Sequence, residues 1–87
     1  MSEDELIARV SQAGQKVVGT KQTLKALEKG EALLVLVADD AEEKVIRPVV
    51  ALAEARGVEL RRIDSMLELG KLCGIKVKAA AAAILEL

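Results

Sequence analysis

Seven consecutive apolar residues stand near the middle of this chain with no polar residue among them. Residues 32–38 read Ala-Leu-Leu-Val-Leu-Val-Ala and are followed by Asp39 and Asp40. The run is far shorter than the roughly 18 apolar residues that span a membrane. A short, continuous run rich in Val and Leu is typical of a β-strand that is covered on both faces. The sequence therefore predicts a sheet packed between helices.

Helical and extended patterns alternate along the rest of the chain. Ser2 with Glu5 and Ser65 with Glu68 fit capping boxes at helix starts, and Gly30, as the C′ residue, fits a helix end. The expected helices are 2 to about 14, 20–29, 42–47, 48–56 and 65–73, and the expected strands are 16–18, 32–38 and 58–63. This alternation predicts one α/β domain, residues 1–87, built as an α/β/α sandwich with a small mixed sheet.

Two segments resist a simple assignment. Pro48 falls inside a helical pattern and removes a backbone hydrogen bond, so we expect a kink or break after Arg47. Asp40 with Glu43 is expected to cap the helix before that break. The alanine run, residues 79–83, is helical by propensity. The short connection before it and the apolar Ile84 after it also suit a buried strand with small side chains, so the residues alone leave both readings open.

The composition excludes several functions. The chain has no Phe, Tyr, Trp or His and one cysteine. We therefore do not expect a domain that binds nucleic acid by stacking bases on aromatic side chains, and catalysis by a histidine base is excluded. A single cysteine forms no internal disulfide and no zinc site without histidine. The acidic start of the chain argues against a targeting peptide, and a cytoplasmic protein is expected.

Charge is unevenly distributed, although the formal net charge is only −1. Residues 14–29 carry four lysines against one glutamate, and residues 69–78 carry three lysines and no acid. The remainder of the chain is acidic. A nucleic acid bound by such a protein would be held loosely by charge alone, and its shape or base contacts would have to supply affinity.

The junction after Val18 carries the strongest indication of function. Lys21 and Lys25 are four apart and share a helix face, and the Gln22 amide beside them can both donate and accept hydrogen bonds. Lysines at a helix N-terminus oppose the helix dipole, and such a conflict is expected at a functional site. A solvated first turn is the simpler alternative. The stretch from Gly14 to Lys21 resembles a phosphate-binding loop, but its Lys and Thr are in the wrong order.

Three other segments have a functional and a structural reading. In the stretch from Gly74 to Lys78, two apolar side chains could cover an unstacked base while the lysines meet phosphates, or they could belong to the core. The adjacent Asp39 and Asp40 could hold Mg²⁺, or they could cap a helix. Cys73 is expected to be a buried apolar residue, since no histidine is present to activate it.

Three blocks of the sequence together resemble a known family. The stretches 19–27, 37–41 and 69–77, followed by the alanine run, are similar to the kink-turn RNA-binding ribosomal protein family, the L-seven-Ae / L-thirty-e superfamily, and especially to its bacterial L-seven-Ae-like ribosomal proteins. The resemblance implies a three-layer α/β/α sandwich with a mixed four-stranded sheet, whose last strand runs through the alanines. It also implies binding to the kink-turn, a sharply bent RNA with an internal bulge and tandem sheared G·A pairs.

The resemblance also implies which residues meet the RNA. The start of the helix at residue 20 would enter the opened major groove and contact the guanines, and the loop after Gly74 would lie over the flipped-out bulge nucleotide. By position, the RNA-binding residues are Gly19, Thr20, Lys21, Gln22, Lys25, Ile75, Lys76, Val77 and Lys78. Glu42 matches an acidic position that orients the basic contact in some members. Archaeal and eukaryotic members usually carry Asn-Glu where this chain has Lys21-Gln22.

These observations predict a non-enzymatic, monomeric RNA-binding protein with no cofactor and no metal. It would recognise kink-turn RNA, of the ribosome or of a riboswitch, and stabilise its bend. An α/β protein-interaction or scaffold module without an RNA partner is the alternative, because the net charge is close to zero. A small nucleotide- or metal-dependent enzyme at Asp39 and Asp40 is a third hypothesis.

Overall fold

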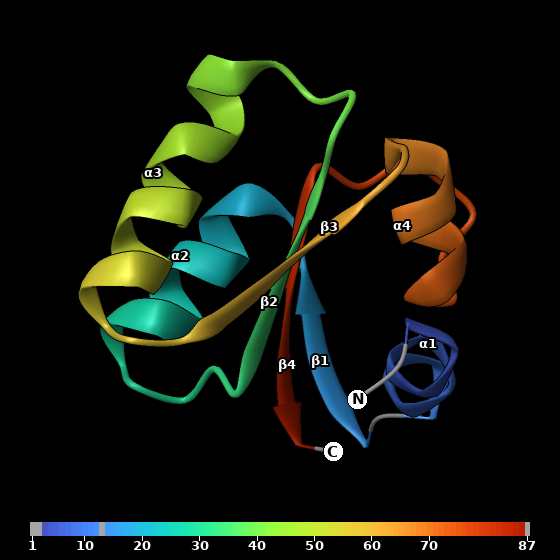
Figure 1. Ribbon diagram of the computed structural model, residues 1–87, viewed down its shortest axis with the longest axis horizontal. Coiled ribbons are helices and arrows are strands. Elements are labelled where there is room, and N and C mark those ends of the chain that lie inside the picture. The colour runs from blue at the N-terminus through green and yellow to red at the C-terminus, as the bar shows by residue number, and fades with distance from the viewer. Residues whose placement is uncertain (1–2, 13, 87) are drawn as a thin grey trace.

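A mixed four-stranded sheet forms the middle layer of the structure (Figure 1). The computed structural model describes residues 3–12 and 14–86. In chain order the elements are α1 (Glu3–Ser11), β1 (Gln15–Val18), α2 (Thr20–Glu28), β2 (Leu34–Ala38), α3 (Glu43–Ala55), β3 (Glu59–Ile63), α4 (Met66–Leu72) and β4 (Ala81–Glu86). Helices α2 and α3 cover one face of the sheet, and α1 and α4 cover the other (Figure 1). The predicted α/β/α sandwich is confirmed.

The order of the strands decides which loops meet. The sheet runs β1-β4-β2-β3, with β2 and β3 parallel and β4 antiparallel to both of its neighbours. Strands β1, β2 and β3 therefore finish at the same end of the sheet, and β4 starts there. We call this the carboxyl end of the sheet. The loops that enter α2, α3 and α4, and the loop that enters β4, all lie at this end.

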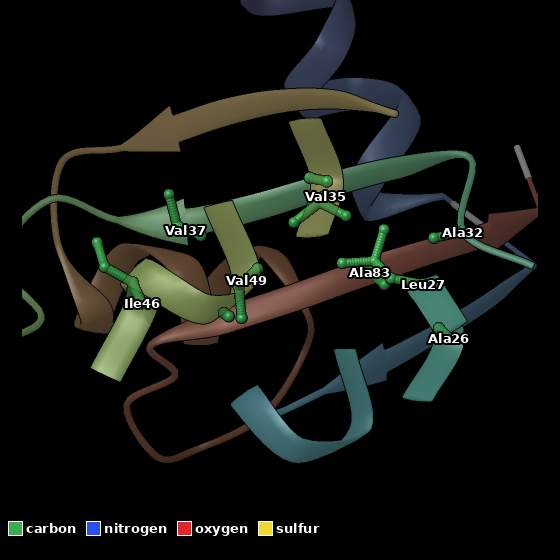
Figure 2. Packing of buried hydrophobic residues seen from close by; sticks show 10 residues of the cluster. Ala26, Leu27, Ala32, Val35, Val37, Ile46, Val49 and Ala83 are labelled. Atoms are coloured by element: carbon green, nitrogen blue, oxygen red, sulfur yellow. The ribbon is translucent and has the colours of Figure 1, made fainter. Parts of the chain in front are cut away.

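Alternate residues of the two central strands face opposite layers. Val35 and Val37 of β2 and Ala83 of β4 lie with Leu27 of α2 and Val49 of α3 (Figure 2). The intervening residues pack against α1 and α4; they are Leu34, Leu36, Ala38, Ala82 and Ile84. Burying one Val or Leu side chain contributes about 1.5–3 kcal/mol. The prediction that the apolar run forms a strand covered on both faces is confirmed, although β2 begins at Leu34.

The alanine run enters a central strand rather than a helix. Strand β4 pairs with β1 on one side and with β2 on the other, and its residues 81–84 are buried. The ladder extends one residue further, because Ala38 N–H donates to the Ala80 carbonyl at 2.9 Å. Two flanking strands satisfy the backbone groups of β4 on both sides, and this pairing outweighs the helix propensity of alanine.

The expected break at Pro48 is wrong. Helix α3 runs continuously from Glu43 to Ala55 with Pro48 inside it. Its buried face carries Ile46, Val49 and Ala53 on both sides of the proline. Pro48 itself is exposed, so its ring faces solvent, and the buried residues before and after it keep the helix continuous although the hydrogen bond to the Lys44 carbonyl is lost.

Caps at the carboxyl end differ from the prediction in one respect. Ser65 Oγ accepts a hydrogen bond from Glu68 N–H at 3.1 Å, as the sequence predicts. The expected cap of α3 by Asp40 is wrong, because Glu42 is the N-cap residue and makes no side-chain cap bond. Asp40 Oδ1 instead accepts a hydrogen bond from Met66 N–H at 2.7 Å. Asp40 follows β2, next to the strand that leads into α4, and this places its carboxylate at the α4 N-terminus.

The start of the chain is described in part. Helix α1 ends at Ser11, earlier than the expected end near Gly14. The expected capping box at Ser2 lies outside the described residues. Within residues 3–12 and 14–86, we find no helix with the length and apolar character that a bilayer crossing requires.

Candidate nucleic-acid interface

The start of α2 leaves backbone donors without a cap. Gly19 is the N-cap residue, with φ of +110°, and it has no side-chain oxygen to accept a hydrogen bond. The N–H groups of the first turn have no acceptor within a helix, and here no side chain of the cap serves them. The first turn also contains no acidic residue. The positive end of the helix dipole is therefore presented together with Lys21.

The polar face of α2 points outward. Lys21, Gln22 and Lys25 are exposed, whereas Thr20 and Gly19 are half-buried. The opposite face is fixed in the core by Thr23, Ala26 and Leu27. Because the buried residues recur at three- and four-residue spacing, they hold the helix in one rotational setting. The two lysines and the amide thus form one outward surface, as the sequence predicts.

The segment after α4 turns back along that helix. Ile75 N–H donates to the Gly70 carbonyl at 3.0 Å, and Ala79 N–H donates to the Met66 carbonyl at 3.1 Å. Residues 75–79 therefore run antiparallel to α4, towards the carboxyl end of the sheet (Figure 1). The half-buried Ile75 side chain packs against the core, whereas Val77 is 68% exposed. Lys76 and Lys78 are exposed on either side of Val77.

Gly70 is required by this close packing. A Cβ built on Gly70 would lie 2.2 Å from the Val77 carbonyl oxygen, which is too close for any side chain. Gly70 is not among the site residues predicted from the sequence. An isolated glycine inside a helical pattern costs about 1 kcal/mol relative to alanine, and such a cost is the signal of a close approach.

A backbone hydrogen bond joins the N-cap residue of α2 to the start of β4. Gly19 N–H donates to the Ala81 carbonyl at 2.8 Å, which continues the pairing of Val18 with Ala82. The N-cap residue of α2 and the first residue of β4 are therefore neighbours at the carboxyl end of the sheet, and the second basic segment ends at Lys78, shortly before Ala81. The exposed lysines nearest to this bond along the chain are Lys21 and Lys78, and Lys25 and Lys76 are exposed further along their segments.

Lys16 belongs to a different part of the surface, although it lies in the first basic segment. Its Nζ donates to the Val10 carbonyl at 3.3 Å, which holds the side chain near the end of α1.

Burial raises the pKa of the Cys73 thiol above its ordinary value, and the positive charge of Lys16 opposes this rise. With 6% of its surface exposed, Cys73 is part of the core, as expected.

The acidic candidates are engaged with protein groups. Asp39 Oδ1 lies 3.2 Å from Arg62 Nη1, and Asp40 binds the Met66 N–H group. In the part of the chain that the structure describes, no cluster of three or more potential ligands is placed to hold a metal ion. Glu42 Oε2 lies 3.5 Å from Lys44 Nζ, so its ion pair is formed at the start of α3. The stretch from Gly14 to Lys21 contains β1 and does not form a phosphate-binding loop.

The chain belongs to the ribosomal protein L7Ae/L30e/S12e/Gadd45 family, whose profile matches residues 2–87. Among curated relatives, the chain is 52% identical over 78 residues to the RNA-binding protein YbxF of Geobacillus stearothermophilus. That match covers 90% of this chain and 95% of the relative.

Other relatives agree in length and fold. The RNA-binding protein BH0128 of Halalkalibacterium halodurans is 51% identical over 76 residues, which cover 87% of this chain and 93% of the relative. The solved structure of a Giardia lamblia 15.5kD RNA binding protein superposes with a TM-score of 0.84 at 28% identity, and the match covers all of this chain and 78% of that chain. A Bacillus halodurans protein of unknown function shares the fold, with a TM-score of 0.80 at 18% identity over 93% of this chain and 81% of that chain.

Proposed function

We propose that this protein is a non-enzymatic RNA-binding protein that recognises kink-turn RNA through its tandem sheared G·A pairs and stabilises the bend. Membership of the family and the RNA-binding relatives support the RNA partner. The observation that carries the location of the site is the hydrogen bond between Gly19 and Ala81, because it places the start of α2 beside the start of β4, where the loop with the second set of lysines ends. One RNA can then contact both segments.

The chemistry of the α2 start suits a groove that a bend has opened. The Lys21 ammonium group can donate to the O6 and N7 acceptors of a guanine edge, and the Gln22 amide can donate and accept at the neighbouring pair. The uncapped N–H groups beside Gly19 can donate hydrogen bonds to a phosphate oxygen. Lys25, one turn further on, adds charge without base information. Glycine at position 19 lets the RNA backbone approach closely.

The loop before β4 supplies the second contact. Val77 offers an exposed apolar side chain that can cover the flipped-out nucleotide of the bulge, and the flanking Lys76 and Lys78 can meet phosphates. Ile75 supports this surface from below, since its side chain packs against the core. Shape would provide most of the selectivity, because few side chains are available to read bases.

The double substitution Lys21→Ala with Gln22→Ala tests this assignment. Each well-formed base contact is worth about 1–3 kcal/mol, so we expect kink-turn affinity to fall at least about tenfold in a gel-shift titration. The charge-matched control is Lys29→Ala at the other end of α2, which also removes one positive charge and where affinity should stay within about twofold. Unchanged affinity in the first variant would remove Lys21 and Gln22 from the interface.

A further inference from the structure

We propose that Asp40 is a positioning residue for RNA recognition, and that it acts through Met66 and Ala79 on the loop that carries Val77 and Lys78. This inference rests on the proposed function. Asp40 itself belongs to the loop after β2 and is not one of the residues assigned to the RNA contact. Its carboxylate contacts α4, and α4 in turn holds the segment before β4.

The first step is a bond between a side chain and a helix start. Asp40 Oδ1 accepts from Met66 N–H at 2.7 Å, the shortest of the hydrogen bonds described above. Met66 is the first residue of α4, so this N–H group has no acceptor within the helix. A negatively charged acceptor is favoured there by the helix dipole. Asp40 and Ser65 together serve two of the donors in this first turn.

The second step uses the other polar group of the same residue. The Met66 carbonyl accepts from Ala79 N–H at 3.1 Å. The orientation of Met66, which Asp40 holds on one side, therefore sets the position of Ala79 on the other. Ala79 directly follows Lys78, so the bond lies next to the proposed contact.

The hydrogen bonds from Met66 to Asp40 and from Ala79 to Met66 form a chain that we call the relay. The sheet anchors this relay. Asp39 N–H donates to the Ile63 carbonyl at 2.8 Å, and Ala38 N–H donates to the Ala80 carbonyl at 2.9 Å. Both bonds hold the backbone on either side of the relay at the carboxyl end of the sheet. Asp40 thus links a rigid strand end to the N-terminus of α4.

The loop is then clamped on both sides of its exposed residues. The bond between Ile75 and Gly70 holds one end, and the bond between Ala79 and Met66 holds the other. Between them, the Val77 carbonyl rests directly against Gly70. An apolar side chain that is 68% exposed is therefore carried on a backbone with little freedom. Binding that requires no ordering of this backbone keeps more of its favourable free energy.

The sign of the charge makes the inference testable. Asp40 is a carboxylate at the end of the sheet that is proposed to meet a polyanion. Electrostatics alone predicts that Asp40→Ala tightens RNA binding. The relay predicts the opposite, because the loop loses one of its clamps. Asp39→Ala is the matched control, since it removes the same charge one residue away and leaves the α4 cap intact.

We would measure the affinity of Asp40→Ala, Asp40→Asn and Asp39→Ala for a kink-turn RNA at one salt concentration. We expect Asp40→Ala to bind about threefold to tenfold more weakly than the wild type, the range set by loss of a helix cap. Asp40→Asn keeps an acceptor oxygen and should bind at least as tightly as the wild type. Asp39→Ala should bind equally or more tightly. Asp40→Ala binding as tightly as Asp39→Ala would overturn the proposal.

A second background separates positioning from a general loss of stability. In a protein that already carries Val77→Ala and Lys78→Ala, the loop has little left to contribute. Asp40→Ala should then cost less than about twofold in affinity, because residues that act through one another are not additive. If Asp40→Ala lowered affinity in that background by as much as it does in the wild-type protein, the proposal would be overturned.

Amide hydrogen exchange tests the relay without RNA. Exchange at the Ala79 amide should accelerate in Asp40→Ala and remain at the wild-type rate in Asp40→Asn and Asp39→Ala. If wild-type protein failed to bind kink-turn RNA, the proposed function would fall, and this exchange experiment would still decide whether Asp40 holds the loop. Unchanged exchange at Ala79 in Asp40→Ala would contradict the relay.

Discussion

Individual lysines at the carboxyl end of the sheet have different environments. Lys78 is exposed in the loop before β4. Lys71 lies in the same basic segment, but its Nζ is 4.0 Å from Glu68 Oε1 on the surface of α4. Lys16 is held near the end of α1. Equal charge in the sequence therefore does not mean equal contribution to RNA binding.

Lys78→Ala should change the salt dependence of RNA binding more than its base preference. A lysine that contacts a phosphate releases a counterion, so its removal should reduce the slope of log affinity against log salt by about one. Affinity measured at several salt concentrations gives this slope. Lys71→Ala is the control and should leave it nearly unchanged. A slope in Lys78→Ala that equals the wild-type slope would show that Lys78 makes no phosphate contact.

At the scale of elements, packing decides where local rules compete. Helix α3 continues through Pro48 because Ile46 and Val49 bury the same face on either side of it. Strand β4 forms from alanines because two neighbouring strands complete its hydrogen bonds. In both cases a tertiary contact overrides the preference of the local sequence.

Pro48→Ala should stabilise the protein if α3 is continuous. Alanine restores the hydrogen bond to the Lys44 carbonyl, and the gain of about 3 kcal/mol is partly offset by a more flexible unfolded chain, which leaves roughly 2 kcal/mol. Urea unfolding followed by circular dichroism measures the free energy of unfolding, since the chain has no aromatic residue for fluorescence. The exposed neighbour Arg47→Ala should change it by less than about 0.5 kcal/mol. A loss of stability in Pro48→Ala would contradict the continuous helix.

The elements differ in how far sequence reasoning can define them. The apolar run that becomes β2 and the cap formed by Ser65 depend on neighbouring residues, and local patterns identify them. The bond from Asp40 to Met66 joins residues 26 positions apart, so no local pattern could show it. For the same reason, the capping rule assigned Asp40 to the next helix in sequence rather than to the helix beside it in space.

At the scale of the whole molecule, topology assembles the candidate site. Charge counting finds two basic segments but gives no reason for them to meet. The strand order β1-β4-β2-β3 places the end of β1 beside the start of β4. Because α2 begins after β1, and the second basic segment ends before β4, the order brings both to the carboxyl end of the sheet. Their positions in space follow from the sheet rather than from either segment.

The central claim is that this surface selects a bent RNA and not RNA in general. The most direct measurement compares the affinity of the protein for a kink-turn RNA with its affinity for the same RNA after both sheared G·A pairs are replaced by Watson–Crick pairs. The two RNAs have the same length and charge, so counterion release contributes equally to both. We predict at least about tenfold tighter binding to the kink-turn RNA than to the RNA with Watson–Crick pairs, because replacing the sheared pairs removes both the bend and the groove contacts. Equal affinity for the two RNAs would contradict the account.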